Sequence, residues 1–156
     1  MSGPHLLHHP LPRRVWLRAG AAACVASALP HARACEFHTG SLRVTHPWTR
    51  ATLPGATSAV LCMRIDEVTL ADRLIGAEAP IAQGAEMGGP EPGAAVDVPV
   101  EVGQTIELDD SRTHLRLTGL RHPLEPGREY PLTLHFERSG VLLARLSVDF
   151  TAMRFR

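Results

Sequence analysis

The feature that most constrains the fold of this 156-residue chain is a strict alternation of apolar and polar side chains toward its C-terminal end. Two segments show it most clearly, residues 130–137 and 141–149, and their apolar positions are Leu132, Leu134 and Phe136, then Leu142, Ala144, Leu146 and Val148. A two-residue period places one set of side chains on each face of a β-strand. The connecting residues 138–140, Arg-Ser-Gly, are typical of a hairpin. These segments therefore predict a half-buried antiparallel strand pair.

The rest of residues 35–156 repeats this pattern in shorter pieces. No stretch keeps the 3.6-residue period of an amphipathic helix, and turn residues separate the apolar runs. Further strands are predicted at residues 42–46, 59–65, 72–78, 105–108 and 113–118, and the Gly/Pro-rich run 88–93 is predicted to be a long loop. About seven short antiparallel strands in one domain predict an all-β fold, either a β-sandwich or a small Greek-key barrel.

Charge divides the chain near residue 34. Residues 1–34 carry four Arg and no acidic residue, whereas residues 35–156 carry 12 Arg and 16 acidic residues, a net charge of −4. The formal balance of zero over the whole chain hides this division. Because a mildly acidic domain lacks the basic surface on which nucleic-acid binding depends, no nucleic-acid partner is expected.

Residues 1–34 have the organisation of an export signal. Basic residues precede an apolar run over residues 19–29, which is too short to span a bilayer, and Ala-Arg-Ala at residues 32–34 predicts cleavage between Ala34 and Cys35. The run PRRVWLR at residues 12–18 is similar to a twin-arginine signal, although a general secretory signal fits equally well. We therefore expect a periplasmic, monomeric protein with no membrane insertion after processing, and residues 35–156 as its single domain.

Processing would leave two cysteines, Cys35 and Cys62. In an oxidising compartment they can form a disulfide between the new N-terminus and the domain body. The alternative is a buried strand position for Cys62 and an exposed, unpaired Cys35. Lipid attachment to Cys35 is less favoured, because Ala32 and Arg33 stand where such a signal usually has Leu and a small residue.

No segment has the pattern of a catalytic site. HExxH, GxSxG and CxxC are all absent from the sequence. The adjacent acids Asp109 and Asp110 would point to opposite faces of a strand and cannot share a proton there. We therefore do not expect an enzyme.

Several segments follow one another in an order typical of a known family. Residues 45–55, THPWTRATLPG, contain a Trp-x-Arg-Ala-x-x-Pro-Gly motif, and residues 113–120 read THLRLTGL. Together with residues 59–61, 71–77, 122–127 and 130–137, they resemble the PCuAC-like family of periplasmic copper chaperones. The resemblance implies a cupredoxin-like Greek-key β-sandwich that binds Cu(I) at an exposed His/Met site and passes the copper to a protein of respiratory oxidase assembly.

The copper ligands of that family are only partly present. The resemblance puts its first His at Ala85, its second Met near Pro92, and its closing His-x-Met pair at His114 and Arg116. On a strand, His-x-Met would place both ligands on one face. A thioether is soft and suits Cu(I), whereas the guanidinium of Arg116 is always charged and repels a cation. Only His114 is retained in its family position.

Met87 lies two residues beyond Ala85 and is a nearby substitute for a lost sulfur ligand. The expected Cu(I) ligands are therefore His114 and Met87, with Glu86 and Cys62 as further possibilities. Since Cys62 and Met63 point to opposite faces of their strand, only one of them can face a site, and core packing is the better interpretation for Met63.

Two alternatives remain open. Cys35, His38 and His46 lie close together in sequence near the processed terminus and could form a separate copper site. Alternatively, the domain keeps the fold without copper and acts as an interaction module. His114 would then hydrogen-bond to a carboxylate such as Glu86, and a salt bridge of Arg116 in the same arrangement would occupy the former metal position.

Overall fold

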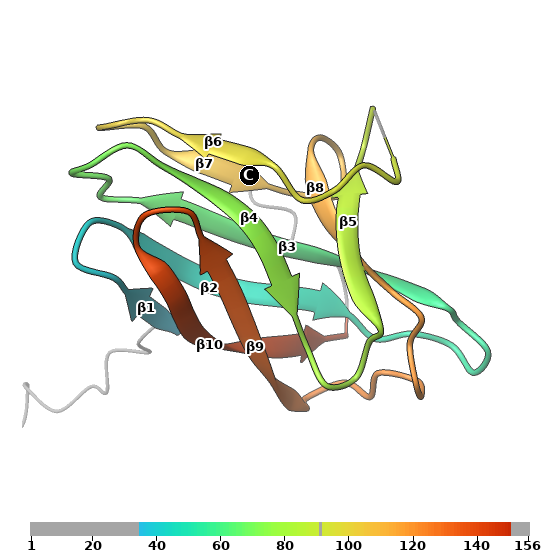
Figure 1. The fold of residues 1–156 in the computed structure, drawn as a ribbon. Helices are drawn as coiled ribbons and strands as arrows, with labels where there is room; N and C mark the ends of the chain where they lie inside the picture. Colours follow the sequence, from blue (N-terminus) through green and yellow to red (C-terminus); the bar gives the residue numbers. More distant parts are fainter. Residues whose placement is uncertain (1–34, 91, 151–156) are drawn as a thin grey trace, which may run out of the picture. The chain divides into compact units, whose positions relative to one another are not determined.

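The computed structural model describes residues 35–90 and 92–150, and this part of the chain is entirely β-structure and turns (Figure 1). Its ten strands are β1 (Glu36–His38), β2 (Arg43–Arg50), β3 (Ser58–Asp66), β4 (Asp72–Glu78), β5 (Gly84–Gly88), β6 (Val98–Val100), β7 (Ile106–Leu108), β8 (His114–Thr118), β9 (Glu129–Phe136) and β10 (Gly140–Asp149). All seven predicted strands are confirmed, and so is the all-β class. The expected export signal lies outside the described residues.

The strands form one curled sheet in the order β5-β8-β3-β2-β10-β9-β4-β6. β1 pairs with β2, and β7 pairs with β3 beyond the end of β8. Every pairing is antiparallel except that of β10 with β2, which is parallel. The prediction of a wholly antiparallel sheet was therefore wrong at this contact. Side-chain alternation is the same in both arrangements, so the pattern of either strand carries no information about the direction of its distant partner.

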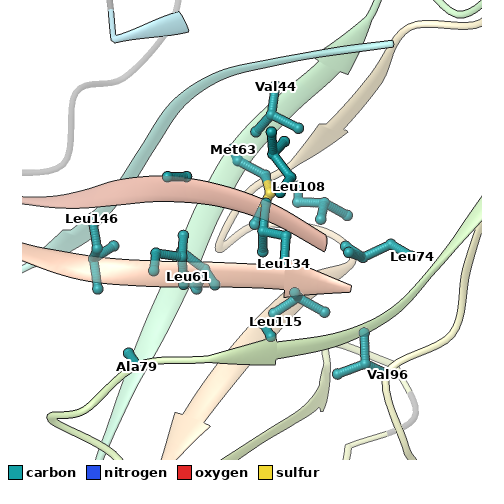
Figure 2. Packing of buried hydrophobic residues seen from close by; sticks show 14 of the residues in the cluster. Val44, Leu61, Met63, Leu74, Ala79, Val96, Leu108, Leu115, Leu134 and Leu146 are labelled. Carbon is teal, nitrogen blue, oxygen red and sulfur yellow. The ribbon is translucent and has the colours of Figure 1, made fainter. Parts of the chain in front are cut away.

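The inner faces of the strands share one apolar core. β3 contributes Leu61, Met63 and Ile65, which are at most 3% exposed, and the other strands contribute residues such as Leu115 and Leu134 (Figure 2). Burying a side chain of this size stabilises the fold by about 1.5–3 kcal/mol. The expected core position of Met63 is confirmed.

Three strands were not predicted. β1 and β6 have three residues each, and β6 has Pro99 at its centre. β5 reads Gly-Ala-Glu-Met-Gly, a composition poor in β-formers, and it extends into the first residue of the predicted 88–93 loop. Each of these strands is defined by its partner, because β5 pairs with β8 along its whole length and β6 pairs with β4. Local sequence alone does not reveal such dependence.

A buried carboxylate ties the start of β4 to the β9–β10 hairpin. Asp72 accepts hydrogen bonds from the backbone N–H groups of Arg73 at 2.7 Å, Arg138 at 2.9 Å and Ser139 at 2.9 Å. Burial by itself raises the pKa of Asp72, but these hydrogen bonds and one from the Ser139 side chain outweigh it, so the pKa is lowered. The ionised carboxylate therefore stabilises the hairpin.

Among residues 35–90 and 92–150, no helix is long and apolar enough to cross a membrane.

Candidate functional site

The sequence-predicted ligands gather around β5 and β8, which lie side by side at one end of the sheet order (Figure 1). Their register pairs Glu86 with Arg116 and Gly88 with His114. Since Leu115 and Leu117, which alternate with them along β8, are fully buried in the core, the side chains of His114 and Arg116 lie on the opposite, outer face. Glu86 shares this face, and so does Val60 of β3, which pairs with Arg116.

His114 is half-buried and held in one orientation. Its Nδ1 lies 3.0 Å from the carbonyl oxygen of Arg112. Because a carbonyl oxygen only accepts hydrogen bonds, the neutral ring carries its proton on Nδ1 and leaves the lone pair on Nε2. A backbone carbonyl in this position is the usual partner of a metal-binding histidine. His114 is therefore arranged as a ligand that binds through Nε2.

The imidazole of His114 lies over Gly88. A Cβ atom added to Gly88 would overlap Nε2 and Cδ2 of the ring and would lie 3.1 Å from Cε1. The ring accordingly covers this glycine, which is buried. The Gly/Pro-rich run predicted a loop at Gly88, and the glycine itself was the one sign of this contact in the sequence.

Arg116 and Glu86 form an ion pair beside His114. Arg116 Nε donates to Glu86 Oε1 at 2.8 Å, and Nη2 donates to the same oxygen. The salt bridge predicted for Arg116 is present, with Glu86 as its partner, whereas His114 bonds to the Arg112 carbonyl instead of to Glu86. The carboxylate of Glu86 is already engaged by a cation, and Arg116 places a positive charge close to His114.

Met87 lies on the other side of this strand pair. Its register partner is Leu115, and its half-buried side chain packs against the core. It also lines a groove of about 290 Å³ between β6 and β7, together with Val98 and Ile106. The structure therefore does not bring Met87 and His114 together on one face.

The buried side chain of Cys62 lies on the face of β3 opposite to Leu61 and Met63, and its register partner on β2 is Trp48. With Trp48, Arg50 and Asp110 it lines a hollow of about 210 Å³, and Arg50 and Asp110 form an ion pair with each other. Burial, followed by the nearby carboxylate of Asp110, raises the pKa of the Cys62 thiol to about 11. The thiol is protonated at neutral pH and is a poor metal ligand in that state.

Cys35 and Cys62 are not joined in the structure: both are free, Cys62 is buried, and Cys35 is partly exposed. The arrangement corresponds to the second alternative for the two cysteines. Cys35 accepts a backbone hydrogen bond from His46 at 2.8 Å through its carbonyl.

The remaining terminal histidines each lie beside a carboxylate. His38 Nε2 is 3.8 Å from Glu36, and His46 Nε2 is 3.7 Å from Asp149. Within residues 35–90 and 92–150, no group of three or more His, Cys, Asp or Glu side chains is placed to hold a metal ion. In this part of the chain, the terminal cluster is therefore not assembled as a site, and no such group surrounds His114.

Comparisons with known proteins agree with this architecture. The family model for LpqE-like lipoproteins matches residues 42–148. The copper-bound PCuAC domain of PmoF2 superposes with a TM-score of 0.68 at 23% identity, over 74% of this chain and 98% of that domain. The apo PCuAC domain of PmoF1 has a TM-score of 0.68 at 24% identity, over 74% and 99%.

A more distant neighbour is Cu(I)-bound DR1885 from Deinococcus radiodurans, with a TM-score of 0.58 at 18% identity over 81% of this chain and 83% of its own. No functionally curated protein matches the sequence. At these identities the structural neighbours establish the fold, and the cupredoxin-like β-sandwich predicted from the sequence is confirmed. The family match spans most of the sheet, and the chain belongs to the LpqE-like lipoprotein family, with the fold of a PCuAC domain.

Proposed function

We propose that this protein is an exported copper-binding protein of the copper-chaperone type, with Cu(I) as its cargo and His114 as its principal ligand. The observation that carries the proposal is the orientation of His114, whose Nδ1 bonds to the Arg112 carbonyl and whose Nε2 lone pair is left for a metal. The fold shared with copper-bound PCuAC domains supports the same assignment. No enzymatic step is part of this proposal.

The proposed site is degenerate. Met87 can join His114 only if β5 rearranges, because their side chains occupy opposite faces of the strand pair. Arg116 donates twice to Oε1 of Glu86, so copper at this carboxylate would lie beside a guanidinium charge, and the Cys62 thiol would have to lose its proton before it could bind copper. One imidazole and weak secondary ligands suit a transient cargo site that an acceptor protein completes. We propose that the acceptor is a copper-receiving oxidase-assembly protein.

A titration of the purified domain, residues 35–156, with Cu(I) against a competing chelator tests the proposal. Wild type should bind copper weakly, and His114→Ala should lose that affinity, while Met87→Ala should change it much less. His135→Ala is the matched control, because His135 is another half-buried strand histidine, paired with Glu78 at 3.1 Å. Equal affinity of wild type and His114→Ala would exclude copper binding through this site.

A second candidate function is a metal-free interaction module, and the Glu86–Arg116 ion pair favours it. The pair places opposite charges on the face that would otherwise present the copper ligands. Under this alternative the wild-type protein shows no Cu(I) affinity at all, and the double substitution Glu86→Ala/Arg116→Ala abolishes binding to a protein partner. The same chelator titration therefore separates the two functions.

We further propose that residues 1–34 are removed on export to the periplasm. The lipoprotein description of the family supports export. Mass spectrometry of the protein recovered from a periplasmic extract should give a chain that begins at Cys35. A lipid-modified Cys35 in the membrane fraction would contradict simple cleavage, and an intact residue 1 would contradict processing.

A further inference from the structure

Gly88 sits directly across from His114 in the β5–β8 ladder. The φ of Gly88 is not positive, so its backbone conformation is one that alanine also adopts. The next glycine differs, since Gly89 has a φ of 96° and an added Cβ would lie 2.7 Å from the Arg112 carbonyl oxygen. The three atoms nearest to an added Cβ at position 88 all belong to the imidazole of His114, so the requirement for glycine there comes from this ring.

The ring of His114 is thus constrained on two sides. Gly88 provides the space into which the Nε2 and Cδ2 edge extends, and the Arg112 carbonyl binds Nδ1. Any larger side chain at position 88 would push the ring off the strand pair, and the hydrogen bond to Arg112 would be lost with it. The His114 side chain has two rotatable bonds, so a larger residue at position 88 would displace the ring and leave the sheet backbone in place.

We infer that Gly88 and the Arg112 carbonyl form a cradle that presets the tautomer and direction of His114, which makes Gly88 a positioning residue for a ligand at Nε2. The ligand class is a soft or borderline metal cation, since the atom presented is an unprotonated imidazole nitrogen. The inference rests on the proposed function only in naming Cu(I) as that cation. Because the His114 ring is already ordered before the metal binds, less conformational entropy is lost on binding.

The test compares two glycine substitutions on the same strand. Gly88→Ala introduces a Cβ that overlaps His114, whereas at Gly84 the same change meets only Thr118 Oγ1 at 3.7 Å, an ordinary contact. Long-range proton–nitrogen NMR of the apo domain, labelled with ¹⁵N-histidine, reports which ring nitrogen of His114 carries the proton. Wild type and Gly84→Ala should show the Nδ1–H form, and Gly88→Ala should show a mixture of tautomers.

The same variants are then titrated with Cu(I) against a chelator. Gly88→Ala should bind about 10- to 100-fold more weakly than wild type, the usual effect of losing a group that orients a metal-binding histidine. Gly84→Ala should bind like wild type. If Gly88→Ala retains both the Nδ1–H tautomer and the affinity, the cradle does not exist. If the tautomers change as expected while wild type binds no copper, the cradle stands and the proposed copper function fails.

Stability measurements cover the case in which Gly88→Ala folds poorly. The midpoint of urea unfolding should fall for Gly88→Ala in the wild-type background and remain unchanged when the same substitution is made in His114→Ala, because the overlapping ring is then absent. A fall of equal size in both backgrounds would show that glycine serves the β5 backbone, and it would overturn the inference.

Discussion

The β9–β10 hairpin and the β5–β8 pair differ in almost every respect that makes a strand recognisable. The hairpin aligns eight residue pairs, and its inner positions are a regular series of apolar side chains. The β5–β8 pair aligns five, and β5 contributes two glycines and a charged residue. The first region supplies stability, while the second carries His114, Arg116 and Glu86. One strand of the proposed site, β5, thus has weak local β-propensity, which is common where function and local consistency compete.

The strongest test of this division is truncation of a core side chain in the hairpin. Leu134→Ala removes a fully buried leucine and should cost about 2–5 kcal/mol of unfolding free energy, because it leaves a cavity as well as losing apolar burial. Leu143→Ala on β10 is the control, since Leu143 is 73% exposed and its loss should change stability by less than about 0.5 kcal/mol. Urea unfolding measures both, and similar losses would contradict the assigned core.

Asp72 tests the anchoring of the hairpin with a smaller effect. Asp72→Ala should destabilise the domain by about 1–3 kcal/mol, because the backbone N–H groups of Arg138 and Ser139 lose their acceptor. The folded-state pKa of Asp72 is lowered, so its stabilisation is fully present above the unfolded pKa of about 3.9 and is lost as the pH falls through the folded pKa. The difference in unfolding free energy between wild type and Asp72→Ala, measured from pH 7 to pH 2, should therefore shrink at the acid end. A difference independent of pH would show that ionisation is not involved.

Arg116→Met tests the proposed metal-binding role of the β5–β8 pair. The change removes a positive charge close to His114 and supplies a thioether, so Cu(I) affinity should rise by about tenfold or more, since charges about 4 Å apart interact by about 1–4 kcal/mol near a protein surface. Stability should change by less than about 1 kcal/mol, because the ion pair with Glu86 is partly exposed. Arg145→Met, which breaks the Arg145–Glu129 pair on the hairpin, is the control and should leave copper affinity unchanged. An unchanged affinity for Arg116→Met would mean that His114 does not face a cation site.

The smallest expected effect concerns the reactivity of Cys62. Its thiol is buried and has a pKa of about 11, so alkylation by iodoacetamide at pH 8 should be much slower than at the partly exposed Cys35. Peptide mapping by mass spectrometry follows each cysteine separately, and denaturant should remove the difference. Trp48→Ala should accelerate modification of Cys62, because Trp48 is the register partner of Cys62 on β2. Equal rates in the native protein would place Cys62 at the surface.

Much of the site could be named from the sequence, but its geometry could not. His114, Arg116, Glu86 and Met87 were all identified as relevant, and a salt bridge of Arg116 was anticipated. The expectation that His114 and Met87 share a ligand role depends on which face each side chain occupies. That requires the register of β5 on β8, and β5 was not recognised as a strand. The role of Gly88 depends on the same register, because a glycine in a Gly/Pro-rich run is normally explained by a turn.

The sequence by itself determined the all-β class, seven of the strands and the inward positions of the core, because a two-residue period survives in any β-pairing and must bury one face. Tertiary structure decided the parallel contact of β2 with β10, the three weak strands and the separation of Met87 from His114. These features arise from pairings between segments far apart in the chain. The hydrogen bonds that define them form between backbone groups, which are the same for nearly every residue, so the side-chain pattern of one segment cannot specify its partner.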